Sequence, residues 1–148
     1  MKLLMIILLA VIALRVAAPP APTVMILYAI PVNPYEPGFR ATGMVESKGD
    51  LLAYNDIEKA YGCVQIREIR LRDYNNRTGS NYSVEDLYDY EISRKIYMYY
   101  ASKIDYRNPE RIAREWNGWV GGMKKKSTEE YWGRISSELR AQGRNVIM

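Results

Sequence analysis

The stretch VESKGDLLAYNDIEKAYGCVQI, residues 45–66, joins a glutamate at the end of an apolar segment to a glycine followed by a short apolar run. The segment before it, Phe39–Val45, predicts a short helix that ends near Glu46. Taken alone, a glutamate at a helix end is most often an ordinary solvated carboxylate. Glu46 becomes a candidate acid only if the run Tyr61–Ile66 forms the floor of a site beside it.

The sequence contains no histidine, and this absence excludes several classes of reaction. Ser-His-Asp catalysis, Cys-His catalysis and His-ligated zinc sites all require that residue. Proton transfer near neutral pH is then left mainly to a carboxyl group whose pKa is raised by burial. The single cysteine, Cys63, cannot form an intramolecular disulfide and is expected to be a small buried hydrophobic side chain. We expect no metal ion and no cofactor.

The composition fits one domain with its own hydrophobic core. The chain has 148 residues, of which 48% are apolar, enough for a single core. Thirteen tyrosines and three tryptophans against one phenylalanine suit the rim of a wet, sugar-binding groove, although tyrosine-rich cores share this bias. The formal net charge is +4, or +2 over residues 19–148 with their 19 basic and 17 acidic residues. This mild excess suits an acidic polymer as a partner and does not indicate binding to nucleic acid.

Residues 1–32 predict a signal peptide or an N-terminal membrane anchor with a Pro-rich linker. The twelve apolar residues of Leu3–Leu14 are followed by Arg15, and they are too few for a full membrane span, which needs about 20. Pro19 would hinder a signal peptidase, so retention as a tether stays open. A second apolar stretch, Val24–Ile30, is a strand, a packing arm or part of that tether. We therefore expect export to the periplasm or cell envelope; the alternative is an N-terminal core segment of a cytosolic protein.

Residues 33–148 predict a mainly α-helical domain. The turn-rich NPYEPG, residues 33–38, marks its start, and no alternating strand pattern of useful length occurs between residues 84 and 142. Three further helices are predicted. The first runs through residues 85–104 after a capping box of Ser83 and Asp86, and the second runs from Asn108-Pro109-Glu110 into WNGWVGG (116–122). The third begins at a capping box of Ser127 and Glu130 and ends at Gly143.

Five segments, in this order, resemble the lysozyme-like domain of soluble lytic transglycosylases and their goose-type lysozyme relatives. They are ESKGD (46–50), YGCVQI (61–66), EDLYDYEISRKIYMYY (85–100), REWNGWVGG (114–122) and STEEYW (127–132). Each is weak by itself, and their order carries the resemblance. Three positions depart from the family pattern: Cys63 replaces a large aliphatic residue, Trp116 replaces a tyrosine, and Gly118-Trp119 replaces a pair of small residues.

The resemblance implies a lysozyme-like fold with a catalytic cleft, in which Glu46 is the single catalytic acid. The implied activity is cleavage of the β-1,4 bond between N-acetylmuramic acid and N-acetylglucosamine in peptidoglycan, leaving a 1,6-anhydro end. Apolar neighbours such as Met44 and Val45 would raise the pKa of Glu46 and keep its proton available. The implied substrate-binding residues are Gln65, Asn117, Tyr131, Trp116 and Tyr61. The rings of Trp116 and Trp119 are either sugar-stacking platforms or core rings.

Two other functions stay open at this point. A hydrolytic muramidase, for example a phage lysis enzyme, usually needs a second carboxylate, and none stands out among Asp50, Asp56 and Glu58. A non-catalytic peptidoglycan-binding protein of the same fold is the other alternative, and an intact Glu46 weighs against it. In each case the expected partner is the peptidoglycan glycan strand, bound by a monomer. The Lys124–Lys126 run lacks the spacing of a phosphate-binding loop and is expected to be solvated.

Overall fold

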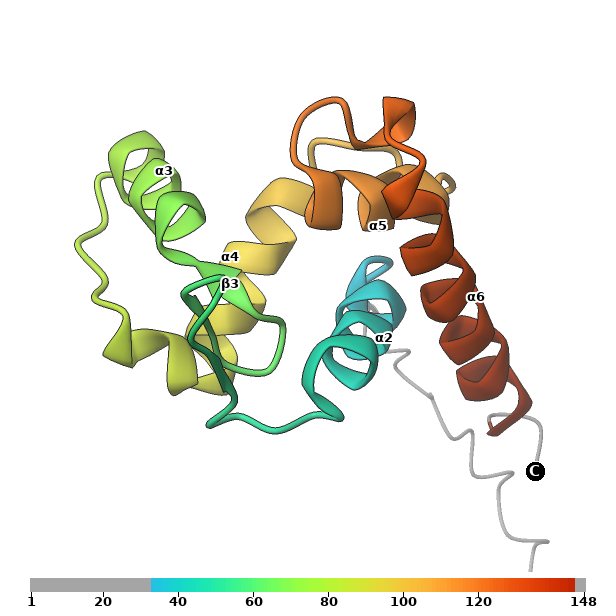
Figure 1. The fold of residues 1–148 in the computed structure, drawn as a ribbon, viewed down its shortest axis with the longest axis horizontal. Coiled ribbons are helices and arrows are strands. Elements are labelled where there is room, and N and C mark those ends of the chain that lie inside the picture. The colour runs from blue at the N-terminus through green and yellow to red at the C-terminus, as the bar shows by residue number, and fades with distance from the viewer. Residues whose placement is uncertain (1–32, 146–148) are drawn as a thin grey trace, which may run out of the picture. The chain divides into compact units, whose positions relative to one another are not determined.

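Helices dominate residues 33–145, the part of the chain that the computed structural model describes (Figure 1). The predicted mainly α class is confirmed. The predicted signal or anchor in residues 1–32, including Leu3–Leu14 and Val24–Ile30, lies outside the described residues. Within the described part, no helix has both the length and the apolar character needed to span a membrane. The elements are α2 (Glu36–Ser47), β1 (Tyr54–Asn55), β2 (Ala60–Tyr61), β3 (Ile66–Arg67), α3 (Glu68–Thr78), η1 (Glu85–Tyr88), α4 (Tyr90–Ala101), α5 (Pro109–Gly118), η2 (Gly122–Lys124) and α6 (Ser127–Asn145).

Helix α2 contains the predicted helical segment and places Glu46 in its last turn, as expected. It begins at Glu36, earlier than the apolar pattern suggests, because proline is tolerated in the first helical turn. It ends where Lys48 adopts a left-handed conformation, with φ of 60°, so that its N–H and that of Gly49 bond back to the last turn. One face of α2, which includes Phe39 and Ala41, is buried against α6 and α5.

A small antiparallel sheet follows α2, and the sequence did not predict it. Its three strands lie in the order β1-β2-β3, with Tyr54 opposite Tyr61 and Tyr61 opposite Ile66. Each strand has only two residues, too few for an alternating pattern to be recognised in the sequence. In Figure 1 the sheet and α6 lie on opposite sides of α2.

The turn between β2 and β3 contacts three helical elements. The Ser47 hydroxyl at the end of α2 donates to the Cys63 carbonyl oxygen at 2.8 Å. The Trp116 indole N–H in α5 donates to the Val64 carbonyl oxygen at 3.2 Å. Gly62, with φ of 73°, packs so closely against η1 that an added Cβ would overlap the Leu87 carbonyl oxygen. Cys63 is buried, as the sequence predicts.

The predicted continuous helix through residues 85–104 is wrong at its N-terminal end, and it ends earlier than predicted, at Ala101. The segment forms the 3-10 turn η1 and then α4, separated by Asp89 in an extended conformation. Asp89 caps α4 by accepting a hydrogen bond from the Ile92 N–H at 2.9 Å. The predicted capping box forms in part, because Asp86 accepts from the Ser83 N–H at 2.7 Å, but it opens only the short turn η1. Asp86 at η1 and Asp89 at α4 therefore split into two elements the segment that the apolar pattern predicts as one helix.

Helices α5 and α6 begin where the sequence predicts. The Asn108 side chain accepts a hydrogen bond from the Arg111 N–H at 3.1 Å and caps α5, which ends at Gly118. Helix α6 starts at Ser127, but its predicted end at Gly143 is wrong because the helix continues to Asn145. Gly143 does not adopt the left-handed conformation of a C-terminal cap, and a glycine inside an exposed helix costs only about 1 kcal/mol.

Gly62→Ala tests how tightly the turn is packed. We expect it to lower the free energy of unfolding by roughly 2–5 kcal/mol, because the left-handed backbone and the overlap with Leu87 both oppose a Cβ. Gly79→Ala is the matched control: its φ is 72°, but nothing lies within 4 Å of the added atom. The control should lose about 1–2 kcal/mol. Urea unfolding measures both, and equal losses would contradict the tight packing of Gly62.

Candidate active site

Glu46 contacts a buried tyrosine across the packed pair of helices α2 and α6. The Tyr131 hydroxyl donates to Glu46 Oε1 at 2.8 Å, and the Tyr131 side chain is only 2% exposed. The second carboxylate oxygen, Oε2, has no hydrogen-bond partner within residues 33–145. Met44, the sequence neighbour expected to bury Glu46, is exposed and lines a different cavity. The partial burial of Glu46 therefore comes from tertiary packing.

Burial raises the pKa of the Glu46 carboxyl above its usual value. The negative charge of Glu58 adds to this rise, whereas the Tyr131 hydroxyl and the positive charges of Arg134 and Arg67 reduce it. Burial also raises the pKa of Tyr131 well above its usual value, so its hydroxyl stays a donor. Glu46 thus keeps its proton to higher pH than a surface glutamate, which is the property required of a general acid near neutral pH.

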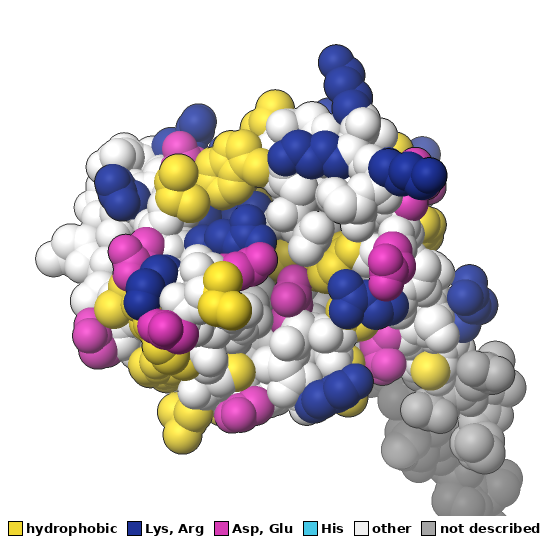
Figure 2. Space-filling view, viewed as in Figure 1, with side chains coloured by type: hydrophobic (Ala, Val, Ile, Leu, Met, Phe, Trp, Pro, Cys, Tyr) yellow, Lys and Arg dark blue, Asp and Glu magenta, His cyan; other side chains and the backbone are white. Residues whose placement is uncertain are grey.

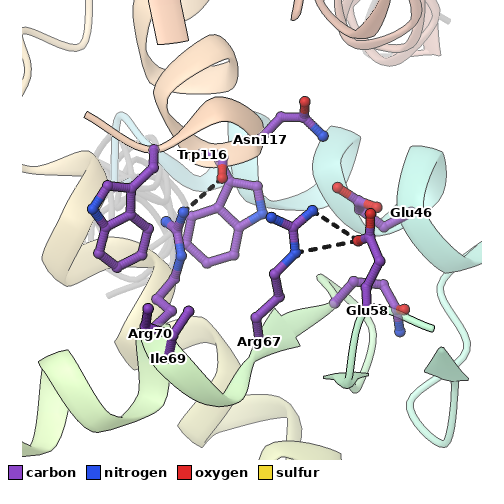
Figure 3. A pocket seen from close by; sticks show the side chains of 9 residues that line it. Glu46, Glu58, Arg67, Ile69, Arg70, Trp116 and Asn117 are labelled. Atoms are coloured by element: carbon purple, nitrogen blue, oxygen red, sulfur yellow. Dashed lines mark hydrogen bonds and ion pairs between the residues drawn. The ribbon is translucent and has the colours of Figure 1, made fainter. Parts of the chain in front are cut away.

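A cavity of about 240 Å³ opens beside Glu46. Its walls come from the end of α2, the small sheet with its turns, the start of α3 and the end of α5 (Figure 3). The face in Figure 2 is hollowed near its centre, and Asp and Glu side chains lie in and beside the hollow, with Lys and Arg side chains among them. The charged side chains that line the cavity are Glu46, Glu58, Arg67 and Arg70.

Glu58 brings a second carboxylate to this cavity. Arg67 binds its Oε2 through two nitrogens, Nη2 at 2.8 Å and Nε at 3.2 Å. Both side chains are about half exposed, so the pair contributes little to stability. The other two carboxylates considered from the sequence do not line the cavity: Asp56 pairs with Lys59 at 2.6 Å, and Asp50 is exposed in the turn after α2.

Gln65 and Asn117, both predicted from the sequence, line the same cavity as Glu46. The Gln65 amide donates to the carbonyl oxygens of Gly62 at 2.9 Å and Ala53 at 3.3 Å, so its N–H groups stabilise the turn. Asn117, near the end of α5, is half-buried. Its side chain has no hydrogen-bond partner in the described part of the chain, which leaves its amide available to a ligand.

The aromatic residues predicted for the site separate into three roles. Trp116 is both a core ring, 4.7 Å from the Tyr97 ring, and a wall of the cavity. Tyr131 does not line the cavity; from α6, its hydroxyl donates a hydrogen bond to Glu46. Tyr61 is not brought to the cavity, because its ring packs 4.9 Å from Tyr54 and its hydroxyl donates to Glu68 at 3.0 Å. Trp119, half-buried in the loop after α5, lines the cavity as well.

Sequence reasoning missed three lining residues, Arg67, Ile69 and Arg70. Helical spacing in REIRLR, residues 67–72, could not have found them together, because Arg67 ends β3 and only Ile69 and Arg70 lie in α3. Nothing local distinguishes a buried arginine from a solvated one. Arg70 is 7% exposed, and its position depends on residues more than forty positions later.

Comparisons of the chain with protein families, with curated proteins and with solved structures found no match. Within residues 33–145, no three His, Cys, Asp or Glu side chains form a group that could hold a metal ion. The side chains at the cavity supply a carboxyl with a raised pKa, a carboxylate paired with arginine, two amides and two indoles.

Glu46→Gln should stabilise the protein at neutral pH. A raised folded-state pKa means that the wild type loses stability as pH rises from the unfolded-state value, near 4.5, through the folded-state value. Glutamine keeps the acceptor for Tyr131 and cannot ionise, so the variant escapes this loss. Its melting temperature should exceed that of the wild type at pH 7.5, and the difference should shrink toward zero at pH 4.

Glu130→Gln is the matched control, because Glu130 is an exposed carboxylate in the first turn of α6. It should give no gain, since an acid near the positive end of a helix is mildly stabilising. A Glu46→Gln protein less stable than the wild type at pH 7.5 would contradict the burial of this charge.

Proposed function

We propose that the protein cleaves the glycan strands of peptidoglycan, at the β-1,4 bond after N-acetylmuramic acid, as a lytic transglycosylase. The observation that carries the proposal is Glu46 itself. Its carboxyl has a raised pKa, accepts a hydrogen bond from a buried tyrosine and lies at the edge of a cavity. Support also comes from the grouping of Gln65, Trp116 and Asn117 around that cavity, since two further segments of the resemblance supply them beside the one that contains Glu46.

In the proposed reaction, Glu46 gives its proton to the glycosidic oxygen while the bond from that oxygen to C1 of the muramic sugar breaks. The hydroxyl on the sixth carbon of the same sugar then bonds to C1, and its proton passes to the Glu46 carboxylate. No water is consumed and Glu46 returns to its starting form, so one carboxylate is enough. Because Tyr131 occupies Oε1, Oε2 is the oxygen free to carry the proton.

The other cavity residues hold the sugar in this proposal. The open amide of Asn117 suits an N-acetyl group, whose carbonyl accepts and whose N–H donates. Trp116 and Trp119 also line the cavity, with Arg70 between their rings. The half-buried Trp119 can offer the indole surface that Arg70 leaves uncovered to the apolar face of a sugar ring. The proposed setting is the periplasm or cell envelope, with residues 1–32 as signal or tether.

A hydrolytic muramidase is the second candidate function, and one observation favours it. Glu58 lines the same cavity as Glu46, so a second carboxylate is present that could activate a water. Its ion pair with Arg67 weighs against this role, because a base must be free to accept a proton. A non-catalytic peptidoglycan-binding protein needs no proton donor. That function therefore gives no role to the raised pKa of Glu46.

Glu46→Gln should abolish the release of soluble fragments from purified peptidoglycan, while helical circular dichroism stays unchanged. Glutamine preserves the shape and the Tyr131 contact but cannot donate the proton. Fragment release is measured by chromatography, with Glu130→Gln as the matched control that retains wild-type activity. A Glu46→Gln protein with most of the wild-type rate would refute the assignment, and an equal loss in Glu58→Gln would favour the hydrolase.

A further inference from the structure

Arg70 is a buried cation without an acidic partner in residues 33–145. Its guanidinium carbon lies 4.1 Å from the Trp116 ring centre and 4.5 Å from that of Trp119, and Figure 3 shows it between two indole rings. Its Nη2 donates to the Trp116 carbonyl oxygen at 2.6 Å. No buried side-chain nitrogen of the described residues lacks a partner. The other two guanidinium nitrogens, Nε and Nη1, have no protein partner and are therefore at least partly accessible to solvent.

Arg70 separates the cavity at Glu46 from a second cavity of about 350 Å³. Arg70, Trp116 and Trp119 line both, so these side chains form the boundary at which the two cavities adjoin. Trp119 adopts φ of 63° and ψ of −167°, a backbone conformation that a non-glycine residue rarely adopts and that costs roughly 1–3 kcal/mol. This strained position is what sets the indole beside the guanidinium.

The second cavity has an excess of positive charge. Four basic and two acidic side chains line it. Both acids are already paired, Asp73 with Arg77 at 2.8 Å and Glu115 with Arg111 at 2.8 Å. The remaining cations are Arg70 and Lys103. The Lys103 ammonium lies 3.9 Å from the centre of the Tyr99 ring and has no ion pair in the described part of the chain.

We propose that the second cavity binds a carboxylate of the substrate, held by the free N–H groups of Arg70 and by the Lys103 ammonium. A guanidinium whose plane is fixed between two rings presents its edges in a fixed direction. Nη1, together with the second N–H of Nη2, forms an edge that matches the two oxygens of a carboxylate. Burial lowers the pKa of Arg70 to about 10, a sign that this cation lacks the compensation an anion would supply.

The source of the carboxylate rests on the proposed function. In peptidoglycan each muramic sugar can carry a short acidic peptide, so a strand bound with its sugar at Glu46 brings carboxylates to within reach of the adjoining cavity. The second cavity would then select strands that retain their peptides over bare glycan. The exposed apolar side chains of Ile69 and Val120 at the rims suit the methyl groups of such a peptide.

Binding to two forms of insoluble peptidoglycan tests this site, one with its peptides intact and one with the peptides removed enzymatically. The full chain carrying Glu46→Gln is used, so that neither form is consumed, and cosedimentation gives both dissociation constants. We expect binding to the peptide-bearing form to be about tenfold tighter or more, the scale of one or two charged hydrogen bonds. Adding Lys103→Gln should reduce this ratio about three- to fivefold.

Lys126→Gln is the matched control, since it removes the same charge from an exposed position that lines neither cavity. It should leave the ratio unchanged. Arg70→Lys keeps the charge and loses the planar fork, and it should reduce the ratio about tenfold. If Arg70→Lys does not fold, Lys103→Gln decides alone. Equal binding to the two forms, or a ratio that Lys103→Gln and Lys126→Gln change alike, would overturn the proposal.

Cleavage of the bare glycan by the wild type separates the two proposals. Efficient cleavage together with equal binding of the two forms would refute the carboxylate site and leave the activity standing. A preference for the peptide-bearing form that depends on Lys103, without cleavage of either form, would refute the activity and leave the site standing.

Discussion

The arrangement of the site depends on the turn at Gly62–Val64, whose two successive carbonyl groups are bound by two different helices. Ser47 holds the Cys63 carbonyl from α2, and Trp116 holds the Val64 carbonyl from α5. These bonds set the end of α2, and therefore Glu46, at a defined position relative to α5 and its Asn117. Only glycine at position 62 lets the turn approach η1 closely enough.

Two groups at the cavity carry unfavourable energies that the rest of the fold must offset. The Glu46 carboxyl is partly removed from water, and a hydrogen bond from Tyr131 compensates for only part of that loss. The Arg70 guanidinium is buried without an acid, and its contacts with two indole faces supply attraction of roughly 0.5–2 kcal/mol each. Functional sites typically contain groups whose burial raises the free energy of the folded state, and packing elsewhere in the fold offsets that rise.

The sequence predicted those features whose causes are local. The start of α5 follows from Asn108, whose side chain caps an N–H three residues away. The start of α6 at Ser127 was also predicted, although the capping box of Ser127 and Glu130 makes no hydrogen bond within residues 33–145. The break at Asp89 was missed because two possible caps, Asp86 and Asp89, compete within one apolar pattern. The three strands were missed because two residues cannot show alternation.

The candidate site was likewise predicted only for those residues that a local sequence segment identifies. Glu46, Gln65 and Asn117 lie in segments recognised by their residue order, and the structure gathers these three around one cavity. Tyr61 stays away from it because cross-strand pairing puts its ring against Tyr54. Arg70 could not be predicted, since its burial depends on Trp116 and Trp119, which approach it only in the folded chain.

The most direct test of the proposed reaction is the mass of its product. Purified peptidoglycan is digested with the full chain, and the soluble fragments are examined by mass spectrometry without prior chemical reduction. Attack by the sugar's own hydroxyl yields 1,6-anhydro ends, which are one water lighter than hydrolysed ends, and we expect these to predominate. A digest that contains only reducing ends would contradict single-carboxylate catalysis by Glu46 and would indicate that a water, activated by a second carboxylate such as Glu58, attacks the sugar.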